Sequence, residues 1–196
     1  MKTGPAYEEV SVRLFARAGS VDTPAVLEAA ARRAAALNIR RVLVATCSGR
    51  TALAAAKTFG PDVRIIAVTH VTGFSKPNHQ ELTAANRRKL EEAGIPILTA
   101  QHAFGGVGRG IRNRLGAYQV DEIIAFTLRT FGQGTKVAVE ISLMAADAGL
   151  VRTDEDVIAI GGTVSGCDTA LRLRPANSAH VLDLKVREII CKPADF

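Results

Sequence analysis

The stretch Arg40-Arg41-Val42-Leu43-Val44-Ala45-Thr46-Cys47-Ser48-Gly49-Arg50-Thr51 decides how the rest of the chain is interpreted. Its first half is an apolar run with the length of a buried strand, and Ala52–Lys57, which follows, consists almost entirely of strong helix formers. The polar residues between them therefore form the turn from a strand into a helix. The unpaired N–H groups and the positive dipole end of a helix N-terminus favour an anion at such a turn.

A plain helix cap is the alternative interpretation of this turn. Ser48 alone can cap a helix, and Gly49 alone can loosen the turn. A cap requires neither the guanidinium of Arg50 nor the second hydroxyl of Thr51. Four or five donors are enough to hold a phosphate, because each charge-assisted hydrogen bond contributes about 1.5–3 kcal/mol. The anion site is therefore the preferred interpretation.

The composition is that of an ordinary globular domain. Of the 196 residues, 47% are hydrophobic and 22% are charged, which predicts a single domain over residues 1–196 with its own core. No apolar run approaches the ~20 residues of a membrane span, and the N-terminus lacks the apolar segment of a signal peptide. The three cysteines, Cys47, Cys167 and Cys191, are far apart. We therefore expect a reduced, cytoplasmic protein with no membrane association, no disulfide and no metal site.

The net charge of +6 raises the question of nucleic-acid binding. However, the 25 basic residues are interleaved with 19 acidic ones along the whole chain. Aromatic residues make up only 5% and tryptophan is absent, so the chain has few side chains that could stack on bases. Small anionic ligands are the better explanation of the charge, and no nucleic-acid partner is expected.

Strands and helices are expected to alternate through the first two thirds of the chain. Strands are expected at residues 10–16, 40–45, 63–68, 95–99, 156–160, 169–174 and 186–191, and helices at 22–38, 52–57, 78–94, 121–131 and 135–148. Within the first strand, Val12, Leu14 and Ala16 share a face. The fold class predicted from this order is α/β: a three-layer α/β/α sandwich whose sheet is mostly parallel with an antiparallel edge.

Two local patterns refine this expectation. Asn78 followed by Glu81 has the form of a capping box, which starts the third helix at residue 78. Residues 169–174 alternate apolar side chains with arginines, a pattern that favours a more exposed, antiparallel edge strand.

Two further segments follow strands, where open α/β sheets bind ligands. Thr69–Phe74 carries a histidine and two threonines, and a binding site and a plain connector explain it equally well. Gln101–Gly110 is rich in glycine but lacks the spacing of a dinucleotide fingerprint, so a flexible loop or lid is expected. Several charged or polar side chains are interpreted as solvated or structural: Arg109, Arg112, Arg114, His102, Glu140 and Asp147.

Taken together, these motifs resemble a known domain. Thr46–Thr51 followed by residues 63–69 resembles the C-terminal α/β domain of pyruvate kinase, whose T-x-S-G-R-[ST] loop binds the phosphate of a sugar-bisphosphate effector. Residues 156–174 resemble the last hairpin of that domain, which closes over the effector. From end to end the chain is similar to a family of stand-alone pyruvate kinase α/β-domain-like proteins. The matching runs are Thr69–Phe74, Gly134–Lys136 with Glu140 and Met144–Asp147, Gly161–Gly162 with Gly166–Thr169, and Glu188–Cys191.

The resemblance implies bound FMN, because that family is associated with this cofactor. By the resemblance, the phosphate would be held by Thr46, Ser48, Gly49, Arg50 and Thr51. The ribityl chain and ring would be lined by Thr69, His70, Gly73, Phe74, Gly161, Gly162, Thr163, Gly166 and Asp168. Cys47 is interpreted as a small space-filling residue. Near the ring the candidates are His70, His102 and Cys167, and none is assigned a catalytic role.

Two functions remain open from the sequence. The first is a flavin-binding protein with FMN as cofactor, for which oxidoreductase activity is one option, since a flavin brings its own redox chemistry. The second is a non-catalytic module that senses a phosphorylated metabolite. Pyruvate kinase activity is not expected, because its catalytic barrel alone needs about 250 residues. A homo-oligomer is expected by analogy with the pyruvate kinase domain.

Overall fold

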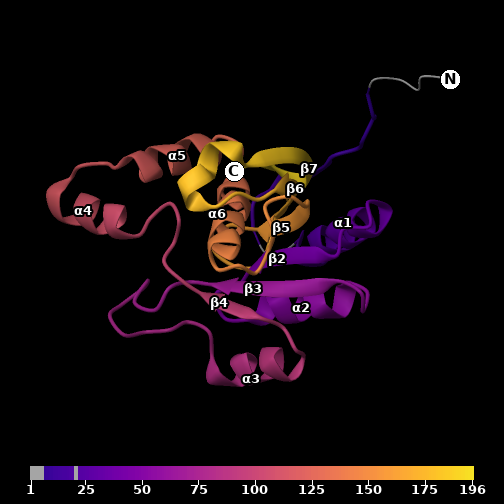
Figure 1. Cartoon of the computed structure of the whole chain (residues 1–196), viewed down its shortest axis with the longest axis horizontal. Coiled ribbons are helices and arrows are strands. Elements are labelled where there is room, and N and C mark those ends of the chain that lie inside the picture. Colours follow the sequence, from indigo (N-terminus) through magenta and orange to yellow (C-terminus); the bar gives the residue numbers. More distant parts are fainter. Residues whose placement is uncertain (1–6, 20–21) are drawn as a thin grey trace.

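Within residues 7–19 and 22–196, which the computed structural model describes, seven strands form one sheet in the order β1-β7-β6-β5-β2-β3-β4 (Figure 1). The strands are β1 (Arg13–Arg17), β2 (Arg41–Ala45), β3 (Arg64–Thr69), β4 (Ile97–Thr99), β5 (Val157–Gly161), β6 (Thr169–Arg174) and β7 (Lys185–Asp195). Neighbouring strands are parallel except at β5–β6 and β6–β7. The prediction of a mostly parallel sheet with antiparallel pairing toward one side is confirmed.

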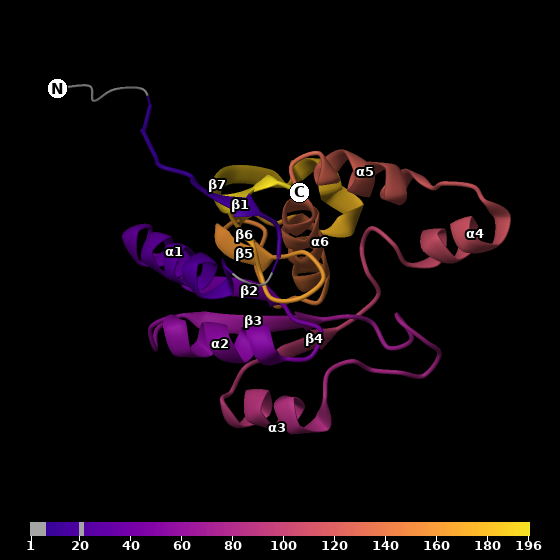
Figure 2. The same ribbon diagram turned by 180° about the vertical axis from the view of Figure 1, so that it is seen from behind.

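Helices cover both faces of this sheet (Figures 1 and 2). They are α1 (Thr23–Ala36), α2 (Arg50–Thr58), α3 (Ala84–Glu92), α4 (Val107–Leu115), α5 (Val120–Arg129) and α6 (Gln133–Asp147), with a short 3-10 segment, η2 (Ser178–Asp183). Side chains of α1, α2 and α3 share one hydrophobic cluster with the sheet, and α5 and α6 share another. The three-layer α/β/α arrangement predicted from the sequence is thereby confirmed.

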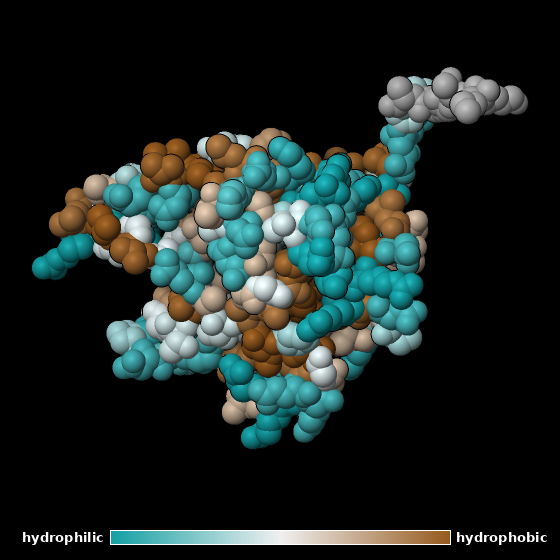
Figure 3. All heavy atoms as spheres, viewed as in Figure 1, coloured by the Kyte–Doolittle hydropathy of each residue, from teal (hydrophilic) through white to brown (hydrophobic). Residues whose placement is uncertain are grey.

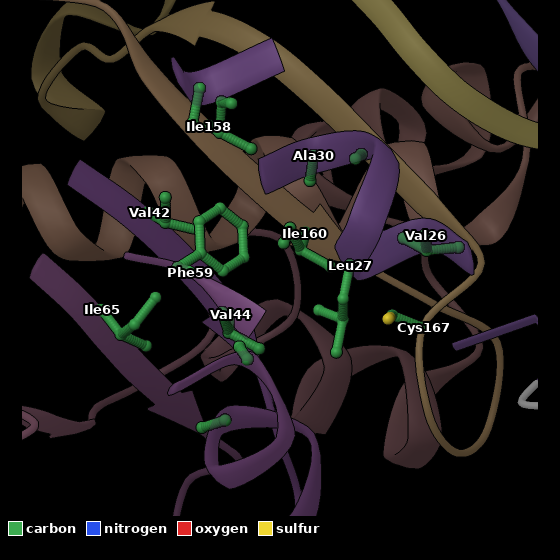
Figure 4. Close-up of a cluster of buried hydrophobic side chains, with 14 of the residues drawn as sticks. Val26, Leu27, Ala30, Val42, Val44, Phe59, Ile65, Ile158, Ile160 and Cys167 are labelled. Carbon is green, nitrogen blue, oxygen red and sulfur yellow. The ribbon is translucent and has the colours of Figure 1, made fainter. Parts of the chain in front are cut away.

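Strand β2 shows how one apolar run serves both clusters. Val42 and Val44 face the cluster that contains Leu27 of α1 and Ile160 of β5 (Figure 4). Leu43 points to the opposite face, toward α6, because side chains alternate along a strand. Each of these side chains is fully buried, and such burial stabilises the fold by about 1.5–3 kcal/mol per large apolar residue. β2 and the turn that follows it are consequently held firmly in place.

Strand β6 is antiparallel as predicted, but it is not an exposed edge. β7 and then β1 lie beyond it in the sheet, and Leu171 and Leu173 have no exposed surface. The intervening Arg172 does not need solvent, since its guanidinium pairs with Asp156 at 2.8 Å. An alternation of apolar and basic residues therefore marks a strand in which an ion pair, rather than water, satisfies the polar positions.

The first strand begins later than predicted and buries the other face. β1 starts at Arg13 and pairs with β7. Leu14 is 59% exposed, whereas Phe15, on the opposite face, is 8% exposed and joins the core. Val12 and Leu14 therefore lie on an exposed face of the sheet.

The third helix also begins later than predicted. α3 starts at Ala84, where Thr83 is the N-cap and its Oγ1 accepts a hydrogen bond from the Asn86 N–H at 3.2 Å. Asn78 instead adopts a positive φ of 61° in the preceding loop. Glu81 is thus free of any capping role and pairs with His70, as described below.

The glycine-rich segment predicted to be a flexible loop contains a helix. α4 spans Val107–Leu115 despite Gly108 and Gly110 inside it. It packs against α5, and Arg112 forms an ion pair of 3.0 Å with the buried Glu122 rather than lying free in solvent. Tertiary contacts therefore override the weak helix propensity of this segment.

Exposed apolar side chains gather over α4 and α5, where Figure 3 shows hydrophobic surface. They include Val107, Leu115, Tyr118, Val120, Ile123 and Phe126. Among the described residues, no helix combines the length and the apolar character needed to cross a membrane.

Candidate functional site

A cleft of about 1350 Å³ opens where β2, β3 and β5 end. Parallel strands with a common direction bring their carboxyl ends to one edge of the sheet, and ligands of open α/β sheets bind there. The turn into α2, the loop after β3, the loop after β5 and the buried face of α6 each contribute to the walls. The lining includes Thr46, Cys47, Ser48, Arg50, Thr51, Val68, Thr69, His70, Phe74, Glu81, His102, Val137, Glu140, Ile141, Met144, Gly162, Thr163 and Gly166.

The turn from β2 into α2 has the geometry of an anion site. Gly49 adopts a left-handed conformation with φ of 92°, and an added Cβ would lie 2.8 Å from Leu82 Cδ1, so only glycine fits. α2 begins directly after it at Arg50, and no side chain in the described part of the chain caps its first turn. The Arg50 Nε donates to Ser48 Oγ at 3.2 Å, which folds the guanidinium back over the turn. Backbone N–H groups, hydroxyls and a positive charge therefore meet at one end of the cleft.

Two threonine hydroxyls at the cleft lack partners. Thr46 Oγ1 and Thr163 Oγ1 are both buried, and neither has a hydrogen-bond partner among the described residues. Thr46 directly follows β2 and is only 5% exposed, whereas Thr163 lies in the loop after β5. Unsatisfied buried polar atoms are rare in folded proteins and cost about 1–3 kcal/mol each. A ligand with oxygen atoms in the cleft would satisfy both.

The loop after β3 supplies aromatic rings to the cleft. The rings of His70 and Phe74 lie 4.1 Å apart, and the Phe74 ring stacks on that of His102 at 5.0 Å. His70 Nδ1 lies 2.6 Å from Glu81 Oε2, and its Nε2 lies 3.4 Å from Cys47 Sγ. These contacts fix the His70 ring between the loop and the turn.

A buried ion pair supports the wall that α6 contributes. Lys136 and Glu140 are one helical turn apart and their side chains pair directly, with 3% and 5% exposure. Glu140 Oε1 also accepts the N–H of Phe104 at 3.0 Å, which ties the loop before α4 to α6. Burial lowers the pKa of Lys136, while the neighbouring Glu140 opposes that shift. Glu140 therefore joins the loop before α4 to α6, and it also lines the cleft.

His102 is neutral at physiological pH. Burial lowers its pKa from 6.5 to about 4, with Glu140 acting in the opposite direction. Its Nε2 accepts the N–H of Val71 at 3.4 Å, which requires that nitrogen to be unprotonated. This residue was predicted to be structural, and its hydrogen bond and burial agree with that role.

We expect the stability of the protein to fall between pH 6.5 and pH 4 because of His102. In this pH window His102 is protonated in the unfolded chain but not in the folded protein. Because the unfolded state binds more protons, lowering the pH stabilises it relative to the folded state. The depressed pKa corresponds to about 3 kcal/mol of unfolding free energy over the window. Urea unfolding at several pH values measures it. His102→Gln retains an acceptor for the Val71 N–H and should show a shallower pH dependence; an unchanged slope would contradict the assignment.

The structure brings most of the predicted site residues to the cleft. Ten line it: Thr46, Ser48, Arg50, Thr51, Thr69, His70, Phe74, Gly162, Thr163 and Gly166. Of these, Thr69 already uses its hydroxyl internally, in a 2.7 Å contact with Thr99 Oγ1. Its role is thus to join β3 to β4 as well as to line the wall.

Four predicted residues are not among the lining residues. Asp168 is fully buried, and its carboxylate accepts hydrogen bonds from the Gly19 N–H and the Thr169 hydroxyl instead. Gly161 is required for packing, because a Cβ there would overlap the Gly134 carbonyl of α6. Gly49 and Gly73 shape turns with positive φ beside the cleft.

The cysteine suggested for the ring site lies elsewhere. Cys167 is 1% exposed in the core beside α1 (Figure 4), where its backbone N–H donates a hydrogen bond to Thr23 Oγ1 at 3.0 Å. Burial raises the pKa of its thiol to about 12. The expectation that it approaches a ligand is therefore wrong.

Glu81 and the contact between Cys47 and His70 were missed from the sequence. The sequence patterns favour a helix cap for Glu81 and space filling for Cys47. No local pattern connects the two with His70, because they lie on three different segments. The only available signal was that Cys47 and His70 follow neighbouring parallel strands.

Comparisons with known proteins identify the family to which the chain belongs. The model of the pyruvate kinase alpha/beta domain family matches residues 24–171. A crystal structure of a pyruvate kinase from Cryptosporidium parvum is 18% identical, with a TM-score of 0.43, and the match covers 81% of this chain and 23% of that one. The ADP complex of the Cryptosporidium parvum enzyme is also 18% identical, with a TM-score of 0.39 and coverage of 86% and 24%. The chain thus spans about a quarter of the length of these pyruvate kinases. It belongs to the pyruvate kinase alpha/beta domain family.

Proposed function

We propose that the cleft binds FMN, or a similar phosphorylated small molecule, with its phosphate on the Thr46–Thr51 turn. The observation that carries this proposal is the buried hydroxyl of Thr46, which has no partner within residues 7–19 and 22–196, beside a start of α2 that no side chain of those residues caps. A phosphate has enough acceptor oxygens for the hydroxyls, the free N–H groups and the guanidinium of Arg50 at once.

The remaining walls of the cleft are apolar, in contrast to the polar Thr46–Thr51 turn, and this supports a flat, partly apolar group next to the phosphate. Val137, Ile141 and Met144 of α6 present apolar side chains, and Phe74 presents an aromatic ring. Ligand pockets are typically about 300–1,000 Å³, so the cleft's volume of about 1350 Å³ is sufficient for a nucleotide-sized molecule. The hydroxyl of Thr163 is available to a polar chain between the two ends.

When bound, FMN would supply hydride or electron transfer, and the residues of the chain would bind and orient it. Ser48, Arg50 and Thr51 would hold the phosphate. The neutral imidazole of His102 and the apolar side chains of α6 would keep water away from the ring. Turnover would require a second substrate that reaches the same cleft.

We expect the purified protein to take up FMN and to gain stability from it. At a free FMN concentration 100 times the dissociation constant, the stabilisation is about 2.7 kcal/mol, which raises Tm by about 5–10 °C for a chain of this size. Absorbance of the desalted protein and thermal unfolding with added FMN measure both. A protein that takes up no FMN but is stabilised by fructose 1,6-bisphosphate would overturn the flavin assignment and favour a metabolite sensor.

A further inference from the structure

Three side chains in the cleft form a continuous hydrogen-bonded chain that phosphate binding does not require. Glu81 Oε2 lies 2.6 Å from His70 Nδ1, and Cys47 Sγ lies 3.4 Å from His70 Nε2. An ionised carboxylate only accepts hydrogen bonds, so Nδ1 carries the proton and Nε2 is left to accept from the thiol. Cys47, His70 and Glu81 thus follow the order of nucleophile, base and orienting carboxylate that activates a cysteine for covalent catalysis.

Further contacts hold the His70 side chain and backbone in this arrangement. The Phe74 ring packs 4.1 Å from the His70 ring, and Gln80 donates to the His70 carbonyl at 3.1 Å, so the histidine is held from both sides. All three members of the chain line the cleft and remain partly accessible, with 30% of the His70 side chain and 29% of the Glu81 side chain exposed. In the described parts of the chain, no group of three or more such side chains is placed to hold a metal ion.

Cys47 differs from the other two cysteines in every relevant respect. It is partly exposed, whereas Cys167 and Cys191 are 1% and 0% exposed in the core. Burial and the nearby Glu81 raise the pKa of the Cys47 thiol, so it stays protonated at neutral pH and needs a base at the moment of attack. His70 is that base by position.

We propose that Cys47 and His70 are catalytic residues, positioned by Glu81, that hydrolyse acyl phosphates bound on the Thr46–Thr51 turn. This inference rests on the phosphate site of the proposed function. Cys47 belongs to the same turn as Ser48 and Arg50, so a phosphate held there brings the atoms attached to it next to Sγ. In an acyl phosphate the carbonyl carbon is separated from phosphorus by a single oxygen.

The reaction balances without an additional reactant. Cys47 Sγ bonds to the carbonyl carbon while its proton moves to His70 Nε2, and the carbonyl electron pair moves to oxygen. The electron pair on that oxygen then re-forms the carbonyl double bond, and the bond from carbon to the phosphate oxygen breaks. Phosphate leaves with the proton from His70. His70 then takes a proton from water, the resulting hydroxide adds to the thioester carbon, and the C–S bond breaks. The thiolate recovers the proton, giving a carboxylic acid and phosphate.

The test uses acetyl phosphate with the full chain. We expect a hydroxylamine-labile acetyl thioester on Cys47, located by peptide mass spectrometry, and phosphate release that FMN inhibits by competition. His70→Asn should lower the rate of phosphate release by roughly 10²–10⁴-fold. Glu81→Gln should lower kcat while KM stays the same. Glu91→Gln, which removes an exposed carboxylate paired with Arg87, is the matched control and should leave the rate unchanged.

Flavin fluorescence on the same preparations separates this inference from the proposed function. If FMN binds but acetyl phosphate leaves Cys47 unmodified, the catalytic inference is overturned and the phosphate site stands. Modification of His70→Asn at the wild-type rate also overturns it. If Cys47 is acetylated and FMN does not bind, the nucleophile is supported and the flavin assignment fails. Because Glu81 is partly exposed, Glu81→Gln keeps the test valid should His70→Asn not fold.

Discussion

Replacing Ser48 and Thr51 together by alanine should weaken FMN binding by roughly 10²–10⁴-fold and leave riboflavin binding almost unchanged. In the proposed complex each hydroxyl would donate a hydrogen bond to the charged phosphate, and each such bond contributes about 1.5–3 kcal/mol, so losing both should cost about 3–6 kcal/mol. Riboflavin lacks the phosphate and makes neither bond. Titration of flavin fluorescence measures both affinities.

The matched control for this experiment lies on the same helix. Thr58 is at the far end of α2, where it is exposed and its hydroxyl donates to the Ala54 carbonyl at 3.1 Å. Thr58→Ala changes the same chemical group away from the cleft and should leave both affinities unchanged. Equal losses of FMN and riboflavin in the double variant would mean that Ser48 and Thr51 shape the cleft without binding phosphate.

The turn between β2 and α2 could be predicted from sequence because its determinants are local. An apolar run, a polar turn and a run of alanines are contiguous in residues 40–57, and the structure places the strand and the helix on either side of the turn as expected. The positive φ of Gly49 also follows from local chemistry, since only glycine adopts it without strain.

The contacts between loops could not be predicted in the same way. Cys47, His70 and Glu81 are brought together only by the register of β2 beside β3 and by the path of the loop before α3. The capping-box pattern of Asn78 and Glu81 does not start the helix. Thr83 caps α3 instead, and Glu81 pairs with His70. The same side chain can form its hydrogen bonds with a residue distant in sequence, and a local motif does not reveal that partner.

The interior of the sheet illustrates the same limit. Alternation in β6 was interpreted as exposure to solvent, but Asp156 provides the partner for Arg172 across the sheet. Asp156 also lies 2.9 Å from Arg187, and these arginines lower the pKa of its carboxyl group. Polar residues at alternate positions predict that a partner exists, without indicating whether it is water or a carboxylate.

Replacing Glu140 by alanine should lower the free energy of unfolding by about 3–5 kcal/mol. The variant leaves the ammonium of Lys136 buried without a counter-charge, and breaking a buried ion pair from one side has a cost of this size. It also removes the acceptor for the Phe104 N–H. The midpoint of urea unfolding, with the slope checked for constancy, measures the change. By comparison, Glu28→Ala removes an exposed carboxylate 3.9 Å from Arg32 and should cost less than about 1 kcal/mol.

A double variant identifies the cause of that loss. Lys136→Met with Glu140→Gln removes both charges, and the Gln carbonyl keeps an acceptor for the Phe104 N–H. Replacing a buried pair by neutral groups of similar size is often neutral or stabilising, so most of the lost stability should return. If the double variant is as unstable as Glu140→Ala, the attraction between the two charges itself stabilises the fold, because the variant keeps the size of both side chains and the acceptor for Phe104. If Glu140→Ala is no more harmful than Glu28→Ala, water reaches Lys136, and the wall of the cleft formed by α6 is looser than its burial indicates.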